Sequence, residues 1–194
     1  MLIDIDYFKG ALQIPNLAKD ATAFNANYIN VYEPEILTKL LGNTLYQNMI
    51  TNYVSGTPSI WVDLIEGKDY TVTINAVDYT VKWNGLINTE KISLIAYYVY
   101  FNYIQQNYQQ ATGLGIIQSN TENGTIVSPN QKLVWANNEC AKLAGSYPYK
   151  LIGEPTYTPI ETLEASLFYF IANNITDYPN WVYEPFKKIN ILGI

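Results

Sequence analysis

The chain has 194 residues, of which 48% are hydrophobic and 14% charged, so it can bury one substantial core but carries little surface charge. All 11 basic residues are lysine, histidine is absent and the net charge is −6. Tight nucleic-acid binding needs a basic face and favours bidentate arginine, so the composition argues against it, while an acidic wall past which DNA slides is compatible.

The first 66 residues predict four helices, at residues 17–32, 34–41, 44–54 and 58–66. The apolar face of the first helix contains Leu17, Ala21, Phe24, Tyr28 and Val31. Thr57 and Pro58 have the residue types of an N-cap followed by a first-turn proline, and Gly42 and Gly67 are placed to end helices.

Two segments of alternating polar and apolar residues follow. Residues 70–74, YTVTI, and 79–83, YTVKW, are rich in β-branched and aromatic side chains. They predict a β-hairpin at about residues 70–83, with NAVD as its turn.

Residues 89–110 predict a long helix, with Asn88 as N-cap and Glu90 in the first turn. The segment SLIAYYVYFNYIQQNYQQ, residues 93–110, contains five tyrosines. Apolar residues form two opposite stripes, the first being Ile92, Ile95, Ala96, Val99 and Tyr103, and the second Leu94, Tyr98, Phe101, Ile104 and Tyr108. Such a helix must be enclosed by its own fold, a bilayer or other subunits.

A bilayer is excluded for this helix, because its uninterrupted apolar run covers only residues 94–101 whereas a membrane span needs about 20 residues. We therefore expect it to be the central helix of a bundle, with no membrane partner. Tyrosine suits places where a ring packs while its hydroxyl meets water or a partner, so we also expect some tyrosines at subunit interfaces.

The second half of the chain predicts a long loop at residues 112–127 and helices at residues 129–144 and 159–173. Capping boxes are expected at both helix starts, from Ser128 with Gln131 and from Thr158 with Glu161. The expected fold is mainly α: a helical bundle with an inserted hairpin. Residues 1–175 form one domain, and residues 176–194 form an extended C-terminal tail that can be deleted without unfolding the rest.

The residue types present give little support for a catalytic function. Without histidine, a serine–histidine or cysteine–histidine pair is impossible, and we interpret the single Cys140 as a buried core thiol. Asp4 with Asp6, Glu33 with Glu35, and Glu161 with Glu164 are carboxylate pairs that we assign structural roles. We expect no catalytic residue, no metal and no cofactor.

Four segments resemble a family of phage and prophage neck proteins of Bacteroidetes viruses, including the crAss-like group. They are YINVYEPEILTKLLG (28–42), KWNGL (82–86), SLIAYYVYFNYI (93–104) and the stretch from residue 112 to 139. The resemblance covers roughly residues 16–145. Family members often have a Gly-Gly pair after the threonine near 112, whereas this chain has Gly113-Leu114-Gly115, and the last 50 residues have no counterpart.

The resemblance implies a head–tail connector, also called an adaptor or head-completion protein. Such proteins are not enzymes; they form a ring, here expected to have 12 copies, below the portal protein in the neck of the virion. The ring extends the DNA channel without binding DNA specifically and docks the next neck or tail ring. Assembly in the host bacterial cytoplasm is expected.

We expect two groups of residues to contact partners. Leu114, Ile116 and Ile117 of the long loop are expected to reach a neighbouring copy or the portal, and Trp181, Tyr183 and Phe186 of the tail to act as aromatic anchors. Two alternatives stay open. One is a carbohydrate-binding or glycoside-cleaving domain with Glu33, Glu35 and Glu164 as candidate acids in an aromatic cleft; the other is a different tail-completion protein.

Overall fold

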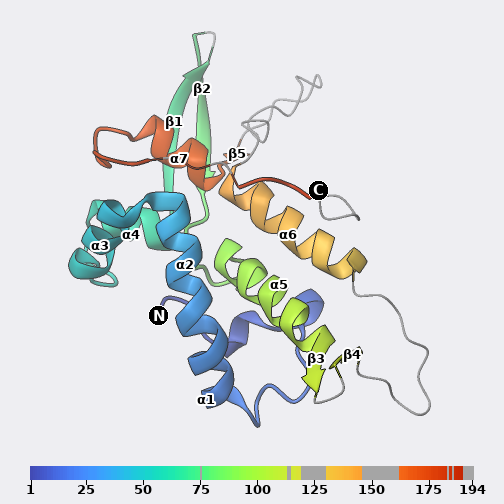
Figure 1. Cartoon of the computed structure of the whole chain (residues 1–194). Coiled ribbons are helices and arrows are strands. Elements are labelled where there is room, and N and C mark those ends of the chain that lie inside the picture. The colour runs from blue at the N-terminus through green and yellow to red at the C-terminus, as the bar shows by residue number, and fades with distance from the viewer. Residues whose placement is uncertain are drawn as a thin grey trace.

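A computed structural model of the chain describes residues 1–74, 76–112, 115–118, 130–145, 162–182, 184 and 186–189, and these form a mainly helical body with a projecting antiparallel hairpin (Figure 1). The helical elements are η1 (Ile5–Tyr7), η2 (Gly10–Leu12), α1 (Ala21–Phe24), the π-helical turn η3 (Asn25–Ile29), α2 (Asn30–Leu41), α3 (Asn43–Asn52), α4 (Ile60–Glu66), α5 (Leu94–Tyr108), α6 (Asn130–Ala144) and α7 (Leu167–Asn173). The strands are β1 (Lys68–Ile74), β2 (Val77–Trp83), β3 (Gln109–Thr112), β4 (Gly115–Gln118) and β5 (Thr162–Glu164).

Helices α1 and α2 form one continuous helical path through η3, so the predicted break before Pro34 is wrong. Pro34 lies inside α2, where it removes one backbone donor, but the helix continues because its next turns bury Ile36 and Leu37 in the core. The π turn adds one residue to a helical turn, so the side chains that follow are rotated about the helix axis. Tyr28 consequently still packs inward, whereas Val31, predicted to lie on the same face, is exposed.

Helix α5 packs against α2 on one side and α6 on another (Figure 1). The chain itself encloses its apolar residues: Leu94, Ile95, Ala96, Val99 and Tyr100 are buried, and the others whose side chains are described between Tyr97 and Ile104 are half-buried. A helix that is apolar on two sides is thus covered mostly by other parts of its own chain.

Helix α5 begins later than predicted. The Asn88 side chain closes a turn instead, accepting from the Ile92 N–H at 3.0 Å and donating to the Ile92 carbonyl at 2.6 Å. Ser93 Oγ then accepts from the Ile95 N–H at 3.2 Å and donates to the Leu86 carbonyl at 2.6 Å. Lys91, with φ of 58°, cannot sit in a right-handed helix, so the start moves to Leu94.

The predicted hairpin is confirmed and is longer than expected. Strands β1 and β2 pair antiparallel from Lys68↔Trp83 to Ile74↔Val77, so Val77 and Asp78, predicted as part of the NAVD turn, belong to β2. Strand β5 pairs parallel with β2 on its other side, giving the order β1-β2-β5. One face of this sheet packs on α7, where the rings of Trp83 and Phe170 stack at 5.5 Å.

The predicted helix at residues 159–173 is wrong in its first part. Residues 162–164 form β5, because backbone pairing with β2 satisfies them and the Ala165 N–H continues the ladder to the Lys82 carbonyl at 2.8 Å. Ser166 is the actual N-cap of α7, accepting from the Tyr169 N–H. The expected caps at Ser128 and Thr158 lie outside the described residues, and α4 is capped by Ser59 rather than Thr57.

The described part of the tail belongs to the hydrophobic core. Tyr178 is 1% exposed and its hydroxyl donates to the Ile60 carbonyl at 2.7 Å, while Phe186 is 6% exposed. Asn138 holds the chain further along, donating to the Ile189 carbonyl at 3.0 Å and accepting from its N–H at 2.9 Å. The described tail residues thus pack on the body, and the expectation that residues 176–194 can be deleted without unfolding the rest stays a prediction.

Candidate interaction surfaces

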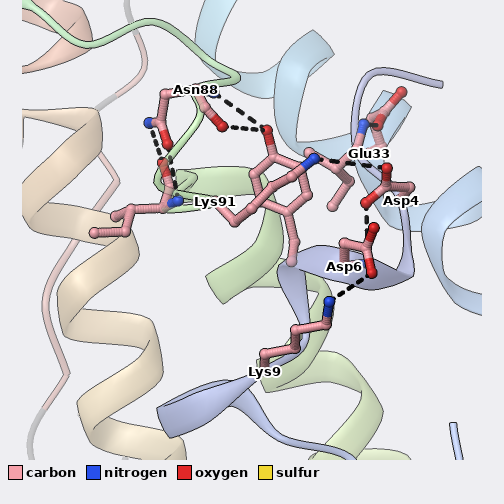
Figure 2. Close-up of polar contacts among 9 residues, drawn as sticks. Asp4, Asp6, Lys9, Glu33, Asn88 and Lys91 are labelled. Atoms are coloured by element: carbon pink, nitrogen blue, oxygen red, sulfur yellow. Dashed lines mark hydrogen bonds and ion pairs between the residues drawn. The ribbon is translucent and has the colours of Figure 1, made fainter.

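The N-terminal segment is held by a buried carboxylate (Figure 2). Glu33, 4% exposed, accepts from the Leu2 N–H at 2.7 and 2.9 Å and from the Ile3 N–H at 3.1 Å. Its oxygens are thus committed to backbone donors, the arrangement that makes a buried charge tolerable. Glu33 thus holds the N-terminal segment against α2.

Asp4 and Asp6 are likewise used within the segment (Figure 2). Asp4 accepts from the Asp6 N–H at 2.9 Å and lies 3.6 Å from the Lys91 ammonium. Asp6 binds Lys9 at 2.7 Å, and this hydrogen bond lowers the pKa of the Asp6 carboxyl. The pair caps and pins η1 rather than forming a reactive site.

Tyr7 joins the N-terminal segment to the loop before α5. Its hydroxyl donates to the Asn88 carbonyl at 3.4 Å and accepts from the Asn88 N–H at 3.2 Å, and the Lys91 ammonium lies 4.6 Å from the ring centroid (Figure 2). Burial raises the pKa of the Tyr7 hydroxyl. The segment therefore forms a structural clamp over this loop.

The other candidate acids of the carbohydrate alternative lie apart from one another. Glu35, on α2, accepts from the Tyr98 hydroxyl at 2.5 Å, and Glu164 is exposed on β5. Within the described residues, no group of three or more His, Cys, Asp or Glu side chains is arranged to hold a metal ion. The side chains described thus do not bring Glu33, Glu35 and Glu164 together as an acid–base set.

An open cleft of about 840 Å³ lies beside the base of the β1–β2 hairpin. Its charged lining residues are Glu66, Lys68, Asp69, Lys82, Glu90 and Lys91. Acids and lysines are present in equal number, so the lining has no net formal charge. Glu66 is occupied by the Tyr53 and Ser55 hydroxyls at 2.8 and 2.7 Å, which hold the pKa of its carboxyl below the usual value.

Many aromatic rings pack between the α1–η3–α2 path and α5. Tyr28 stacks on Phe24 at 5.3 Å and meets the Tyr103 ring edge-on at 5.0 Å. Its hydroxyl accepts from Asn107 at 2.8 Å at the surface. Tyr28 thus has its ring in the fold and its hydroxyl on a surface amide, so it does not require a second copy to cover it.

The two longest stretches of the chain without a charged residue are residues 40–62 and 92–121. The first includes α3, whose outer side presents Ile50 at 50% exposure, Val54 just beyond it at 60%, and the half-buried Tyr46. We define these three residues as the α3 stripe. The second stretch includes α5 and the β3–β4 hairpin, which lies at the far end of α5, on the opposite side of the body from α3 (Figure 1).

The six residues predicted to contact partners have different positions. Ile116 and Ile117 lie in β4, so the segment predicted as a loop begins as a hairpin, while Leu114 and Tyr183 lie outside the described residues. Trp181 is half-buried and donates to the Leu40 carbonyl at 2.9 Å. Phe186 is buried against Tyr98, with ring centroids 5.9 Å apart. In a single copy, both tail rings thus contact their own chain.

Sequence reasoning missed the α3 stripe, although a signal was present. An uncharged stretch of 40–62 with exposed apolar residues stands out in a chain whose overall charged content is 14%.

Comparisons with protein-family models, curated proteins and solved structures found no match to this chain. Among the helices described here, none has the length and apolarity that crossing a bilayer requires.

Proposed function

We propose that this protein is a non-enzymatic structural subunit of a phage connector ring, located in the virion neck between the portal protein and the next neck or tail ring. The support from the sequence is its resemblance to that family over roughly residues 16–145. In this proposal α5 is the central helix of the bundle, and about 12 copies surround a channel through which DNA passes without specific binding.

The observation that carries the proposal is the placement of the two uncharged surfaces. The α3 stripe and the β3–β4 hairpin lie on opposite sides of the α2–α5 body (Figure 1). A ring needs two different faces on each subunit, because a heterologous contact repeats head to tail until the ring closes. Uncharged, partly apolar faces suit permanent contacts, since charged residues are depleted at interface cores.

A third projection provides for contact along the axis of the ring. The β1–β2 hairpin extends from the body at the end away from β3–β4 (Figure 1), with Val77 at 51% exposure next to its turn. Contact with a ring above or below requires a surface distinct from those that join neighbours. In the proposed assembly this hairpin reaches the portal or the adjoining ring.

The charge balance fits a DNA channel. With a net charge of −6 and no arginine, the protein repels the phosphate backbone and does not hold it in place. The carboxylates described above accept hydrogen bonds from backbone N–H groups and from lysine. This structural use agrees with a role in assembly and not in catalysis.

Electron microscopy of the purified protein, alone and mixed with its portal protein, tests the proposal. We expect closed rings with a central channel, stacked coaxially on the portal. A protein that stays monomeric at high concentration and leaves the portal bare would contradict the proposal. Release of reducing sugar from polysaccharide substrates, lost in Glu35→Gln but kept in Asp78→Asn, would favour the carbohydrate alternative.

A further inference from the structure

We infer that the α3 stripe of one copy binds the β3–β4 hairpin of the next copy. This inference rests on the proposed ring and identifies the two surfaces that join its neighbours. The occupant of the α3 stripe is accordingly a second copy of this chain, and the contact is heterologous.

The α3 stripe has the character of a covered surface. Tyr46 and Ile50 lie one helical turn apart on α3, and Val54 follows two residues beyond the end of the helix; Ile50 and Val54 are 50% and 60% exposed. The adjoining side of α3 is already used, because Leu45 and Met49 are buried in the core. Ile50 and Val54 therefore remain outward beside the half-buried Tyr46, among exposed uncharged residues that include Gln47, Thr51 and Ser55.

The β3–β4 hairpin is incomplete by itself. Its strands pair through four residue pairs, Gln109↔Gln118 to Thr112↔Gly115, and within the described residues neither strand pairs with a third. Isolated two-stranded hairpins are marginally stable in water and need a further strand or a packing surface. A hairpin that contains Ala111, Ile116 and Ile117 gains such a surface if it packs on an apolar helix face.

The absence of charge makes the α3 stripe a suitable surface for the hairpin. The hairpin lies in an uncharged stretch, residues 92–121, so it offers no charge to compensate an ion at the receiving site. Burying an unpaired charge is costly, so the receiving surface should be uncharged as well. The α3 stripe meets this condition, whereas the cleft beside the β1–β2 hairpin has six charged lining residues.

The placement of the two surfaces allows the contact between copies and not within one. In Figure 1, α3 and the β3–β4 hairpin are separated by the α2–α5 body. A contact from the hairpin of one copy to α3 of the next copy uses a different face on each partner. Because the two surfaces lie on opposite sides of the body, a pair of copies does not make both contacts at once, and repetition of the contact generates a ring or an open filament.

Cysteine cross-linking between full-length copies tests the inference. Ile50→Cys protein is mixed with Ile116→Cys or Ile117→Cys protein and oxidised; both hairpin positions are used because neighbouring strand residues lie on opposite faces. The native Cys140 is fully buried and does not interfere. We expect a disulfide-linked dimer from at least one mixture, several-fold above the yield from Ile50→Cys with Val77→Cys, a position of equal exposure on β2.

The double variant Ile50→Cys/Ile117→Cys (or Ile50→Cys/Ile116→Cys) distinguishes a ring from a dimer. After oxidation, a heterologous contact links many copies and gives a ladder of species of increasing mass.

Ile50→Lys should raise the concentration needed for assembly at least about tenfold, the effect of losing one central apolar contact. Val31→Lys is the matched control, since Val31 and Ile50 are both 50% exposed on helices.

The outcomes distinguish the two proposals. Rings that form without these cross-links and assemble normally with Ile50→Lys would overturn the inference while leaving the connector ring intact. Protein that forms neither cross-links nor rings, even with portal present, would overturn both. Circular dichroism of Ile50→Lys, expected to match the wild type, shows whether the variant is folded.

Discussion

Replacing Phe186 by alanine should destabilise a single copy of the protein. The ring is 6% exposed and lies between Tyr98, whose ring centroid is 5.9 Å away, and Lys39, whose ammonium is 5.5 Å from the Phe186 centroid. Phenylalanine-to-alanine changes in cores cost about 3–5 kcal/mol. Since a terminal segment can partly collapse into the space left, we expect about 3 kcal/mol, including the aromatic contact.

Thermal unfolding followed by circular dichroism measures this effect. For a chain of this length, about 3 kcal/mol corresponds to a decrease in Tm of roughly 6–12 °C. Val182→Ala is the control on the same segment, because Val182 is 68% exposed and its loss should cost less than about 0.5 kcal/mol. An unchanged Tm for Phe186→Ala, together with lost portal binding, would refute burial in the core and restore Phe186 as an interface anchor.

Three further predictions concern the backbone and the buried tyrosines. Gly85→Ala should lower the free energy of unfolding by roughly 3 kcal/mol or prevent folding, because φ is +80° and a Cβ would lie 2.5 Å from the Ile65 carbonyl oxygen. Urea titration measures this loss. In the same titration Gly56→Ala, at φ +69° with nothing within 4 Å of the added Cβ, should cost only about 1 kcal/mol. Ala76→Gly should stabilise the protein by about 0.5–1 kcal/mol, since Ala76 has φ of 63°, and a lowered urea midpoint would refute the positive-φ turn. Burial raises the pKa of the Tyr178 hydroxyl, so unfolded tyrosine loses its proton first and stability should fall as pH rises above about 10. Tyr178→Phe should show a shallower decline, and an identical slope in both proteins would contradict burial of that hydroxyl.

The broad class of the fold was predictable because its signals are local. Alternating β-branched residues identified the β1–β2 hairpin, and helical periodicity located most of the helical segments. The boundaries of the helices depended on which of several candidate residues forms the N-cap. Asn88 looked like the N-cap of the long helix, but its side chain closes a turn with Ile92, and Ser93 caps the helix. One sequence contains both candidates, and only tertiary contacts choose between them.

Other features depend on distant contacts that the sequence pattern does not reveal. Residues 162–164 join β2 as a parallel strand, a pairing across about 80 positions that overrides the helical signal. Glu33 looked like a first-turn acid, yet it binds backbone donors about 30 residues earlier. Phe186 was assigned to an interface because a tail rich in aromatics resembles one; the same rings suit a core equally well.

The interaction surfaces were partly predictable. Ile116 and Ile117 lie in a projecting hairpin, and their contact with another copy stays a prediction. The α3 stripe required the structure, because apolar residues on and just after a short helix are as typical of a core as of an interface. The exposure of Ile50 and Val54, beside the buried Leu45 and Met49, shows that they point outward.

Cryo-electron microscopy of the assembled neck, with the portal in place, tests the central claim most directly. The account predicts a closed ring of identical copies below the portal, in which each copy contacts two neighbours, with α3 against the neighbouring β3–β4 hairpin. A particle in which this protein is present as a separate copy that touches no other copy of itself would contradict the account.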